Sequence, residues 1–459
     1  MKLFLKISDR LNILLNEKNI NEIIKGSAAT LVLRITGFFL SFILTMIVAK
    51  YYGADALGIL AIMVSLLSIS AVLSLFGFRT ATVRQIARYA KHGRSVLLLI
   101  YKKTGSLVIV LSLLIGTILY LNSAWIALRI FQKEELTLVI KLVAIVLPFR
   151  SINAVNTASL TGLKKITESF SLQLFFPPLL NLILLIILIN VSSNNYLVPV
   201  YANVITIIIS IPLTFYFWYH SLRKIPVTIS TDILESYEQE FSYKGLLALS
   251  LPMFFSASML LIMGAIDTLF LGIFDTTQNT GIYRVALKLT IPVSFVLTAI
   301  NSISNPKFAE LYHHKKFDEL KRSARFASKL SFLFSLPIVL ISLLVVIPIL
   351  SYLGPSFRAG FMPFMILIVG RLVSSYFGPN GSFLNMTDNH KVLGKILALA
   401  ALLNILLNYL LIPPFGIIGA AITTSFSVII LNVSISFVIF KKFGYWINYL
   451  PNFRFRSVS

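Results

Sequence analysis

The chain is a succession of long apolar runs separated by short polar segments. Between Lys25 and Lys50 almost every residue is apolar, and the run exceeds the ~20 residues needed to cross the hydrocarbon core of a bilayer. The same criterion predicts about twelve membrane-spanning helices, which makes the chain an all-α polytopic membrane protein. The spans are expected at 26–49, 57–78, 104–122, 137–160, 171–190, 197–219, 245–273, 281–304, 329–350, 360–384, 394–413 and 417–440.

Composition and charge support this topology. The 459 residues are 57% hydrophobic and 12% charged, against ~25% charged in soluble proteins. The net charge is +23, and the loops predicted on one side carry about thirty of the 40 lysines and arginines, whereas those on the other side carry about four. This asymmetry predicts a multi-pass protein with both termini in the cytoplasm, where the basic loops face anionic lipid. The charge therefore gives no reason to expect nucleic acid as a partner.

Similar features recur about 220 residues apart, which indicates an internal repeat. The pair Lys25-Gly26 opens the first span and Lys244-Gly245 opens the seventh, and the stretches Leu179–Leu188 and Leu402–Leu411 are similar. Because each half has six spans, the halves share one orientation and are expected to be related by a pseudo-two-fold axis along the membrane normal. The expected organisation is an amphipathic N-terminal segment (1–25), a six-helix bundle (26–222), a cytoplasmic linker (223–244), a second six-helix bundle (245–440) and a cytoplasmic tail (441–459).

Several cationic residues fall inside the predicted spans, where a central arginine costs at least ~2.5–3.5 kcal/mol. Each could reach the membrane surface or be hydrogen-bonded locally to backbone carbonyls. If they converge instead, a cationic cleft of low dielectric concentrates an anion, and arginine forks suit phosphate oxygens. Lys141 lies near a helix end and is expected to reach the surface. The candidate substrate-binding residues are Arg34, Arg150, Arg284, Arg371 and Lys288.

Asp267 is the carboxylate that falls clearly within a predicted span. It is expected at a depth similar to Lys288, so a structural ion pair is one interpretation. The other is a cation-coupling site that binds H⁺ or Na⁺, because a carboxylate within the membrane is a functional candidate. In the tenth span, the stretch Gly378–Gly381 is expected to break the helix, which is tolerated only where the backbone is buried in protein or faces water.

The sequence offers little for metal or covalent chemistry. It contains no cysteine, and its five histidines fall in predicted loops without an HExxH pattern. We therefore expect no metal site, no cofactor beyond a coupling H⁺ or Na⁺, and no enzymatic activity. A membrane-embedded polysaccharide polymerase or glycosyltransferase would need an acid/base or metal site, commonly on a large external loop, whereas the predicted outer loops are short.

Several short stretches form a recognisable pattern: Gly26 and Arg34 in the first span, Ala49–Gly53 after it, Gly58-Ile59-Leu60 in the second span, and Phe76-Gly77-Phe78 before a basic loop. With these stretches the first ~90 residues resemble the opening of Wzx-type polysaccharide transporters, and Thr161–Lys165 and Leu353–Phe357 are also similar to that family. The resemblance implies the two-bundle fold of multidrug-and-toxin extruders and lipid II flippases, within the MOP superfamily.

It also implies a function: a flippase in the bacterial inner membrane that moves undecaprenyl-diphosphate-linked oligosaccharide repeat units by alternating access, coupled to a cation gradient. Such a protein is expected to act as a monomer among membrane lipids, next to a polysaccharide polymerase and a chain-length regulator. The principal alternative is a multidrug/cation antiporter of the same fold. That function would need carboxylates to attract cationic drugs, and the predicted spans of the N-terminal half contain none.

Overall fold

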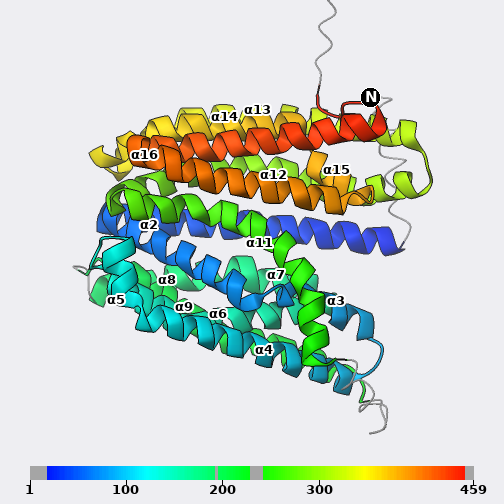
Figure 1. The fold of residues 1–459 in the computed structure, drawn as a ribbon, viewed down its shortest axis with the longest axis horizontal. Coiled ribbons are helices and arrows are strands. Elements are labelled where there is room, and N and C mark those ends of the chain that lie inside the picture. Colours follow the sequence, from blue (N-terminus) through cyan, green and yellow to red (C-terminus); the bar gives the residue numbers. More distant parts are fainter. Residues whose placement is uncertain (1–17, 192–194, 228–240, 450–459) are drawn as a thin grey trace, which may run out of the picture. The chain divides into compact units, whose positions relative to one another are not determined.

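The structure is a computed structural model that describes residues 18–191, 195–227 and 241–449. Regular structure in these ranges is helical, without strands (Figure 1). The chain divides into two compact units, Met1–Leu261 (unit 1) and Ile262–Ser459 (unit 2). Each unit is a set of packed helices with its own apolar core.

Unit 1 contains five complete long helices, joined by shorter elements. Its elements are α2 (Lys18–Leu75), α3 (Phe78–Tyr89), α4 (Arg94–Leu121), α5 (Ser123–Trp125), η1 (Ile126–Ile130), α6 (Leu136–Gly162), α7 (Ile166–Phe170), η2 (Ser171–Phe175), α8 (Phe176–Val191), α9 (Val198–Arg223) and the first part of α11 (Tyr243–Phe274). Of these, η1 and η2 are π-helical turns.

Unit 2 follows the same plan of long helices with short connections. It comprises the remainder of α11, α12 (Thr277–His313), α13 (Phe317–Leu353), the 3₁₀ helix η3 (Pro355–Gly360), α14 (Phe361–Phe377), α15 (Asn380–Met386) and α16 (His390–Phe443).

The two longest helices, α2 and α16, each combine two predicted spans. The joint is a glycine in a conformation that L side chains rarely adopt: Gly53 at φ 80° and ψ −178° in α2, and Gly416 at φ 51° and ψ −130° in α16. Within the described ranges, 9 helices are long and apolar enough to cross a membrane, and a shorter apolar helix covers Met263–Phe274. Two of the nine, α2 and α16, contain two spans each. The number and apolar character of these helices confirm the prediction of an all-α, multi-pass membrane protein.

The predicted break in the tenth span is also confirmed. Helix α14 ends at Phe377, Gly378 takes φ 66° and ψ −147°, and α15 starts at Asn380. A Cβ added to Gly378 would lie 2.4 Å from the Ser328 hydroxyl oxygen, so the close approach of α13 also requires glycine here.

The first part of α11 packs within unit 1. Phe254 stacks on Phe76 with ring centroids 4.9 Å apart, and a Cβ on Gly77 would lie 2.3 Å from the carbonyl oxygen of Ser250. The compact units thus divide inside α11, later in the chain than the predicted linker 223–244. Of the predicted N-terminal segment, residues 1–17 lie outside the described ranges, and Lys18 already belongs to α2. The predicted bundle limits, the tail and the cytoplasmic termini stay predictions.

Candidate functional site: a cationic cavity and a buried carboxylate

Unit 1 contains a partly open cavity of about 620 Å³. Side chains from α2, α6, α9 and the continuous run α7–η2–α8 line it, together with the first turn of α3. Its polar lining residues are Arg34, Ser68, Arg79, Arg150, Asn153, Thr157, Gln173, Thr206, Ser210 and Thr214. None of the described lining residues is acidic, so the cavity carries positive charge without a fixed counter-charge.

Three arginines supply that charge. Arg34 is half-buried, whereas Arg79 and Arg150 expose much of their side chains into the partly open cavity. Arg79 donates a short hydrogen bond to the Gln173 side-chain oxygen, and its charge lies within electrostatic range of Arg150. Among the described residues neither Arg34 nor Arg150 has a hydrogen-bond or ion-pair partner. Like charges held together in a low-dielectric site attract an anion.

A chain of polar contacts fixes α6, and with it Arg150. The Tyr101 hydroxyl donates to Asn156 Oδ1 (2.8 Å), Asn156 Nδ2 donates to Thr214 Oγ1 (3.0 Å), and Thr214 donates to Asn153 Oδ1 (2.6 Å). These contacts join α4, α6 and α9, and satisfied buried networks of this kind hold helices in one arrangement. Arg150 lies one turn before Asn153 on the same helix, so its position in the cavity is set by the network.

The π-helical turn η2 positions Arg79. Gln173 lies in this turn, and its amide nitrogen donates to Ser169 Oγ (2.8 Å), which donates to the Thr157 carbonyl (2.7 Å). π-turns inside α-helices occur frequently at functional sites. Helix α2 approaches the same turn closely, because a Cβ on Gly37 would lie only 2.0 Å from the Leu174 carbonyl oxygen. The wall of the cavity formed where α2 and α3 meet η2 therefore carries Arg34, Arg79 and Gln173.

Unit 2 holds the buried carboxylate. Asp267 on α11 is 4% exposed and accepts hydrogen bonds from three uncharged side chains. Asn408 Nδ2 donates to Oδ1 (2.7 Å), the Tyr283 hydroxyl donates to Oδ2 (3.2 Å), and Thr424 Oγ1 makes a short bond to Oδ2. Asn404 Oδ1 in turn accepts from Asn408 (3.2 Å). The carboxylate therefore sits among oxygen atoms supplied by α12 and α16.

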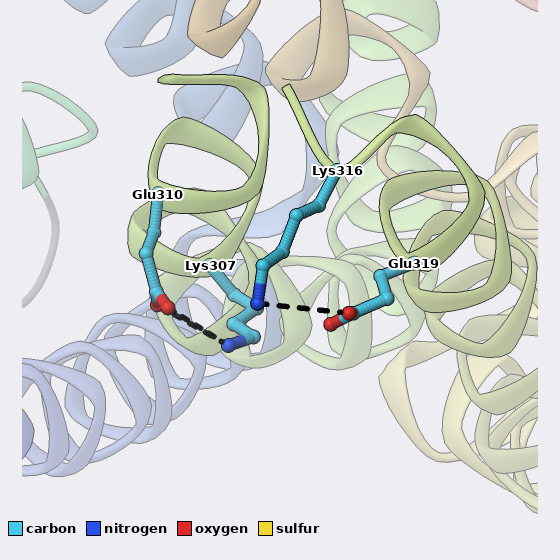
Figure 2. A network of polar contacts seen from close by, with 4 residues as sticks. All are labelled: Lys307, Glu310, Lys316 and Glu319. Carbon is cyan, nitrogen blue, oxygen red and sulfur yellow. Dashed lines mark hydrogen bonds and ion pairs between the residues drawn. The ribbon is translucent and has the colours of Figure 1, made fainter. Parts of the chain in front are cut away.

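The expected ion pair between Asp267 and Lys288 is absent from the described part of the chain. The ion pairs found there are Lys165–Glu168 (3.6 Å), Lys307–Glu310 (3.1 Å) and Lys316–Glu319 (3.7 Å), the last two drawn in Figure 2. All three are exposed i,i+3 pairs, worth ~0–1 kcal/mol each. That interpretation of Asp267 is not borne out: its carboxylate accepts hydrogen bonds from Asn408, Tyr283 and Thr424 instead.

The cations of unit 2 fall into two sets. Lys288 is buried on α12 and lies within electrostatic range of the half-buried Arg284, four residues earlier. Arg371 on α14 is also half-buried, and no ion pair within the described residues joins it to Asp267. Of the predicted substrate-binding residues, Arg34 and Arg150 share the unit 1 cavity, while Arg284, Lys288 and Arg371 lie in unit 2. Their convergence on one chamber stays a prediction.

Sequence patterns do not single out several residues of these sites, among them Arg79, Gln173 and Tyr283. Arg79 lies in a basic segment and directly follows the Phe76-Gly77-Phe78 stretch where the chain leaves the second span. Asn404, Asn408 and Thr424 were not expected around Asp267. The signal for the asparagines was present, since two amides four residues apart in the apolar stretch Leu402–Leu411 lie on one helix face.

Within the described residues no cluster of His, Asp or Glu could hold a metal ion.

Solved structures of two transporters share this all-α, multi-pass fold. The structure resembles Lipid II flippase MurJ in its inward closed conformation, with a TM-score of 0.66, 16% identity, and 91% of this chain and 87% of that chain covered. It also resembles a multidrug resistance MATE family transporter in its inward-facing conformation, with a TM-score of 0.69, 13% identity, and coverage of 91% and 98%. At these identities the likeness establishes the fold.

The sequence assigns the family. Residues 55–354 match the family described as polysaccharide biosynthesis protein, and the chain belongs to that family. Over 165 residues it is 32% identical to the protein named "Probable flippase AglR" of Haloferax volcanii, and this alignment covers 35% of each chain. The chain thus spans about a third of the length of this curated relative.

Proposed function

We propose that the protein is a flippase that moves a polyprenyl-diphosphate-linked oligosaccharide, such as an undecaprenyl-linked repeat unit, across the cytoplasmic membrane by alternating access. The observation that carries the proposal is the unit 1 cavity, in which Arg34, Arg79 and Arg150 face no acidic lining residue. Membership of the polysaccharide biosynthesis family supports a glycan as part of the cargo.

The chemistry of such a lipid matches the cavity. Its diphosphate carries the charge that opposes transfer through hydrocarbon, and guanidinium groups offer forked donors to phosphate oxygens. Thr157 and Ser210 also line the cavity, and their hydroxyl oxygens, which donate to backbone carbonyls of their own helices, can still accept from sugar hydroxyls. The polyprenyl chain can stay in the bilayer while the headgroup is held, so the protein has to shield only the polar end.

Asp267 is the proposed coupling site for H⁺ or Na⁺. Its carboxylate, Asn404 Oδ1 and Thr424 Oγ1 are hard oxygen donors of the kind that Na⁺ prefers. Asn408 Oδ1 is buried without a hydrogen-bond partner among the described residues, which leaves one further acceptor available to a cation. A proton bound to Asp267 would neutralise the buried carboxylate in the same way as Na⁺.

The experiment is a reconstituted translocation assay. Purified protein is placed in vesicles with a fluorescent polyprenyl-diphosphate oligosaccharide, and the fraction reaching the far leaflet is measured with a membrane-impermeant quencher. Arg150→Gln should reduce transport strongly. The matched control is Lys141→Gln on the same helix α6, because Lys141 lies over the Tyr120 ring and does not line the cavity. Equal transport by the wild type and by protein-free vesicles would refute the proposal.

A multidrug antiporter of the same fold is the second candidate, favoured by the buried Asp267 as an attractor for organic cations. The cationic cavity of unit 1 opposes it, because it repels the positive charge of such drugs. Uptake of a fluorescent cationic dye into vesicles, driven by a proton or sodium gradient, separates the two functions. Dye transport without lipid translocation would favour the antiporter.

A further inference from the structure

Two arginines from different helices of unit 1 meet at one phenol. Helix α4 begins at Arg94 and α9 ends at Arg223, and both guanidinium groups donate to the hydroxyl oxygen of Tyr219. The donor nitrogen of Arg223 lies 3.3 Å from that oxygen and the donor nitrogen of Arg94 lies 3.5 Å from it. The two guanidinium carbons also lie over the tyrosine ring, 4.6 Å and 5.5 Å from its centroid. We call these three side chains the arginine–tyrosine cluster.

The packing of α4 and α9 fixes the position of this cluster. Gly93 precedes α4 with φ 94°, and the backbone N–H of Arg94 donates to the Pro226 carbonyl (3.1 Å), which ties the start of α4 to the chain that leaves α9. About two turns further along α4, Tyr101 packs on Trp218 of α9 with ring centroids 5.3 Å apart. The two arginines are therefore held close together by contacts that do not involve their own charges.

The cluster offers hydrogen-bond donors and positive charge without a counter-charge. Neither Arg94 nor Arg223 belongs to any of the ion pairs found in the described part of the chain. The Tyr219 oxygen accepts from both arginines, so its own proton is left to donate, and no described residue accepts it. Two like charges gathered at one oxygen repel each other. An anion such as a phosphate would remove this repulsion and accept from all three groups.

An apolar stripe on α9 leads to the cluster. Ile208, Pro212 and Phe215 are exposed, and their spacing of four and three residues places them on the same helix face as Tyr219. Phe215 stacks on Tyr219 with ring centroids 5.9 Å apart and an angle of 8° between the rings. Tyr219 also ends the predicted span 197–219, and tyrosines are enriched at that depth, where hydrocarbon meets the headgroups. A ligand that covers both parts has an apolar chain and an anionic head.

We propose that the arginine–tyrosine cluster binds the phosphate of an anionic phospholipid whose acyl chains lie along the apolar stripe of α9. Basic pockets between membrane-spanning helices bind such headgroups. A net negative headgroup is favoured over a zwitterionic one, because no described carboxylate of the cluster is present to receive an ammonium group. The inference is independent of the proposed cargo, since none of the three residues lines the unit 1 cavity.

The test counts lipids bound to the purified full-length protein by native mass spectrometry in detergent. Phosphatidylglycerol is titrated against phosphatidylcholine with the same acyl chains. The variants are Arg94→Gln, Arg223→Gln and Tyr219→Phe. The matched control is Arg84→Gln, which removes the same charge from an exposed position on α3, outside the cluster.

We expect the wild type to bind phosphatidylglycerol about 10-fold or more tightly than phosphatidylcholine, because charged hydrogen bonds are each worth about that factor. Arg94→Gln and Arg223→Gln should each lose most of this preference, and Tyr219→Phe should lose about 2–10-fold in affinity. Arg84→Gln should keep the wild-type preference. If Arg94→Gln does not fold, Arg94→Lys replaces it and should bind with intermediate affinity, since it retains the charge without the fork.

Competition separates the lipid from other sources of phosphate. Inorganic phosphate and geranyl diphosphate are added to the lipid-bound protein at equal concentration and ionic strength. Neither should displace phosphatidylglycerol, because inorganic phosphate has no chain for the apolar stripe and the diphosphate has only a short one. Displacement by inorganic phosphate would make the cluster a site for free anions, and displacement by geranyl diphosphate would make it part of the cargo's path. Either result would overturn the inference.

A second arm tests whether the protein's own carboxylates take the place of the lipid. Asp232, Glu235, Glu238 and Glu240 follow α9 in the sequence and lie outside the described residues. A variant with all four changed to the corresponding amides should bind phosphatidylglycerol at least as tightly as the wild type. Binding by this variant alone, equal binding of the two lipids by the wild type, or an unchanged preference in Arg94→Gln and Arg223→Gln would overturn the inference. None of these results bears on the proposed flippase function.

Discussion

The contact between Gly37 and η2 makes a quantitative prediction about unit 1. A Cβ at position 37 would lie 2.0 Å from the Leu174 carbonyl oxygen and 2.8 Å from its carbon. An ordinary carbon–oxygen contact is at least ~3.3 Å, so Gly37→Ala has to separate α2 from η2 by more than about 1 Å. Because the opposing atoms belong to the backbone, no rotamer change relieves the clash.

Overpacking of this kind costs ~1–3 kcal/mol. Alanine also gains up to ~1 kcal/mol over glycine inside a helix, which offsets part of that cost. Gly105→Ala on α4 isolates the clash, because Gly105 is equally buried and its added Cβ would meet Ile152 Cδ1 at an ordinary 3.7 Å. At ~2–4 °C per kcal/mol for a unit of this size, the midpoint of Gly37→Ala should lie roughly 2–12 °C below that of Gly105→Ala.

The assay is a thermal unfolding curve of each purified variant in the same detergent, followed by the translocation assay at a temperature where both are folded. Gly37→Ala should also transport less, since Arg34 lies one turn from the displaced residue. Equal melting midpoints for the two alanine variants would refute the close approach of α2 to η2.

Three further predictions concern the charged groups and one tyrosine. Arg34→Ala and Arg371→Ala should impair export of the cell's surface glycan at normal protein levels, whereas Lys141→Ala should be mild; full complementation would remove the two arginines from the site. Asn408→Leu takes a donor from the buried Asp267, which should cost ~1.5–3 kcal/mol in thermal stability, and less in an Asp267→Asn background; additive losses would contradict the hydrogen bond. Burial raises the pKa of the Tyr445 hydroxyl to about 12, above its unfolded value of ~10. Stability linked to this group is therefore fully present below pH ~10 and is lost as the pH rises towards the folded pKa, so Tyr445→Phe should remove this alkaline loss in melting curves.

Sequence patterns predicted the helices better than the site. Apolar runs located the spans because crossing a bilayer demands a length and composition that are visible in the chain, and Gly378-Pro379 marked a real helix break. The patterns missed that one helix follows the next across a kink at Gly53 and at Gly416, without a loop, because a positive φ leaves no trace beyond the glycine itself.

For the site, the sequence supplied the unusual charges but not their neighbours. Arg34 and Arg150 were identifiable because charge within an apolar run is costly, whereas Arg79 lies in a basic segment and is indistinguishable there from loop residues. The partners of Asp267 were not predictable either. The sequence indicates the depth of Asp267 along its helix, whereas the side of the helix that faces Asn408 and Thr424 depends on tertiary packing.

The uncompensated charge of the unit 1 cavity has a consequence for every measurement on this protein. Three guanidinium groups in one cavity without an acidic lining residue favour binding of small anions such as chloride or phosphate. The headgroup of the proposed cargo would compete with these ions, so its apparent affinity is expected to depend on the salt used. Buffers of large, weakly coordinating anions should bring measured values nearest to the intrinsic one.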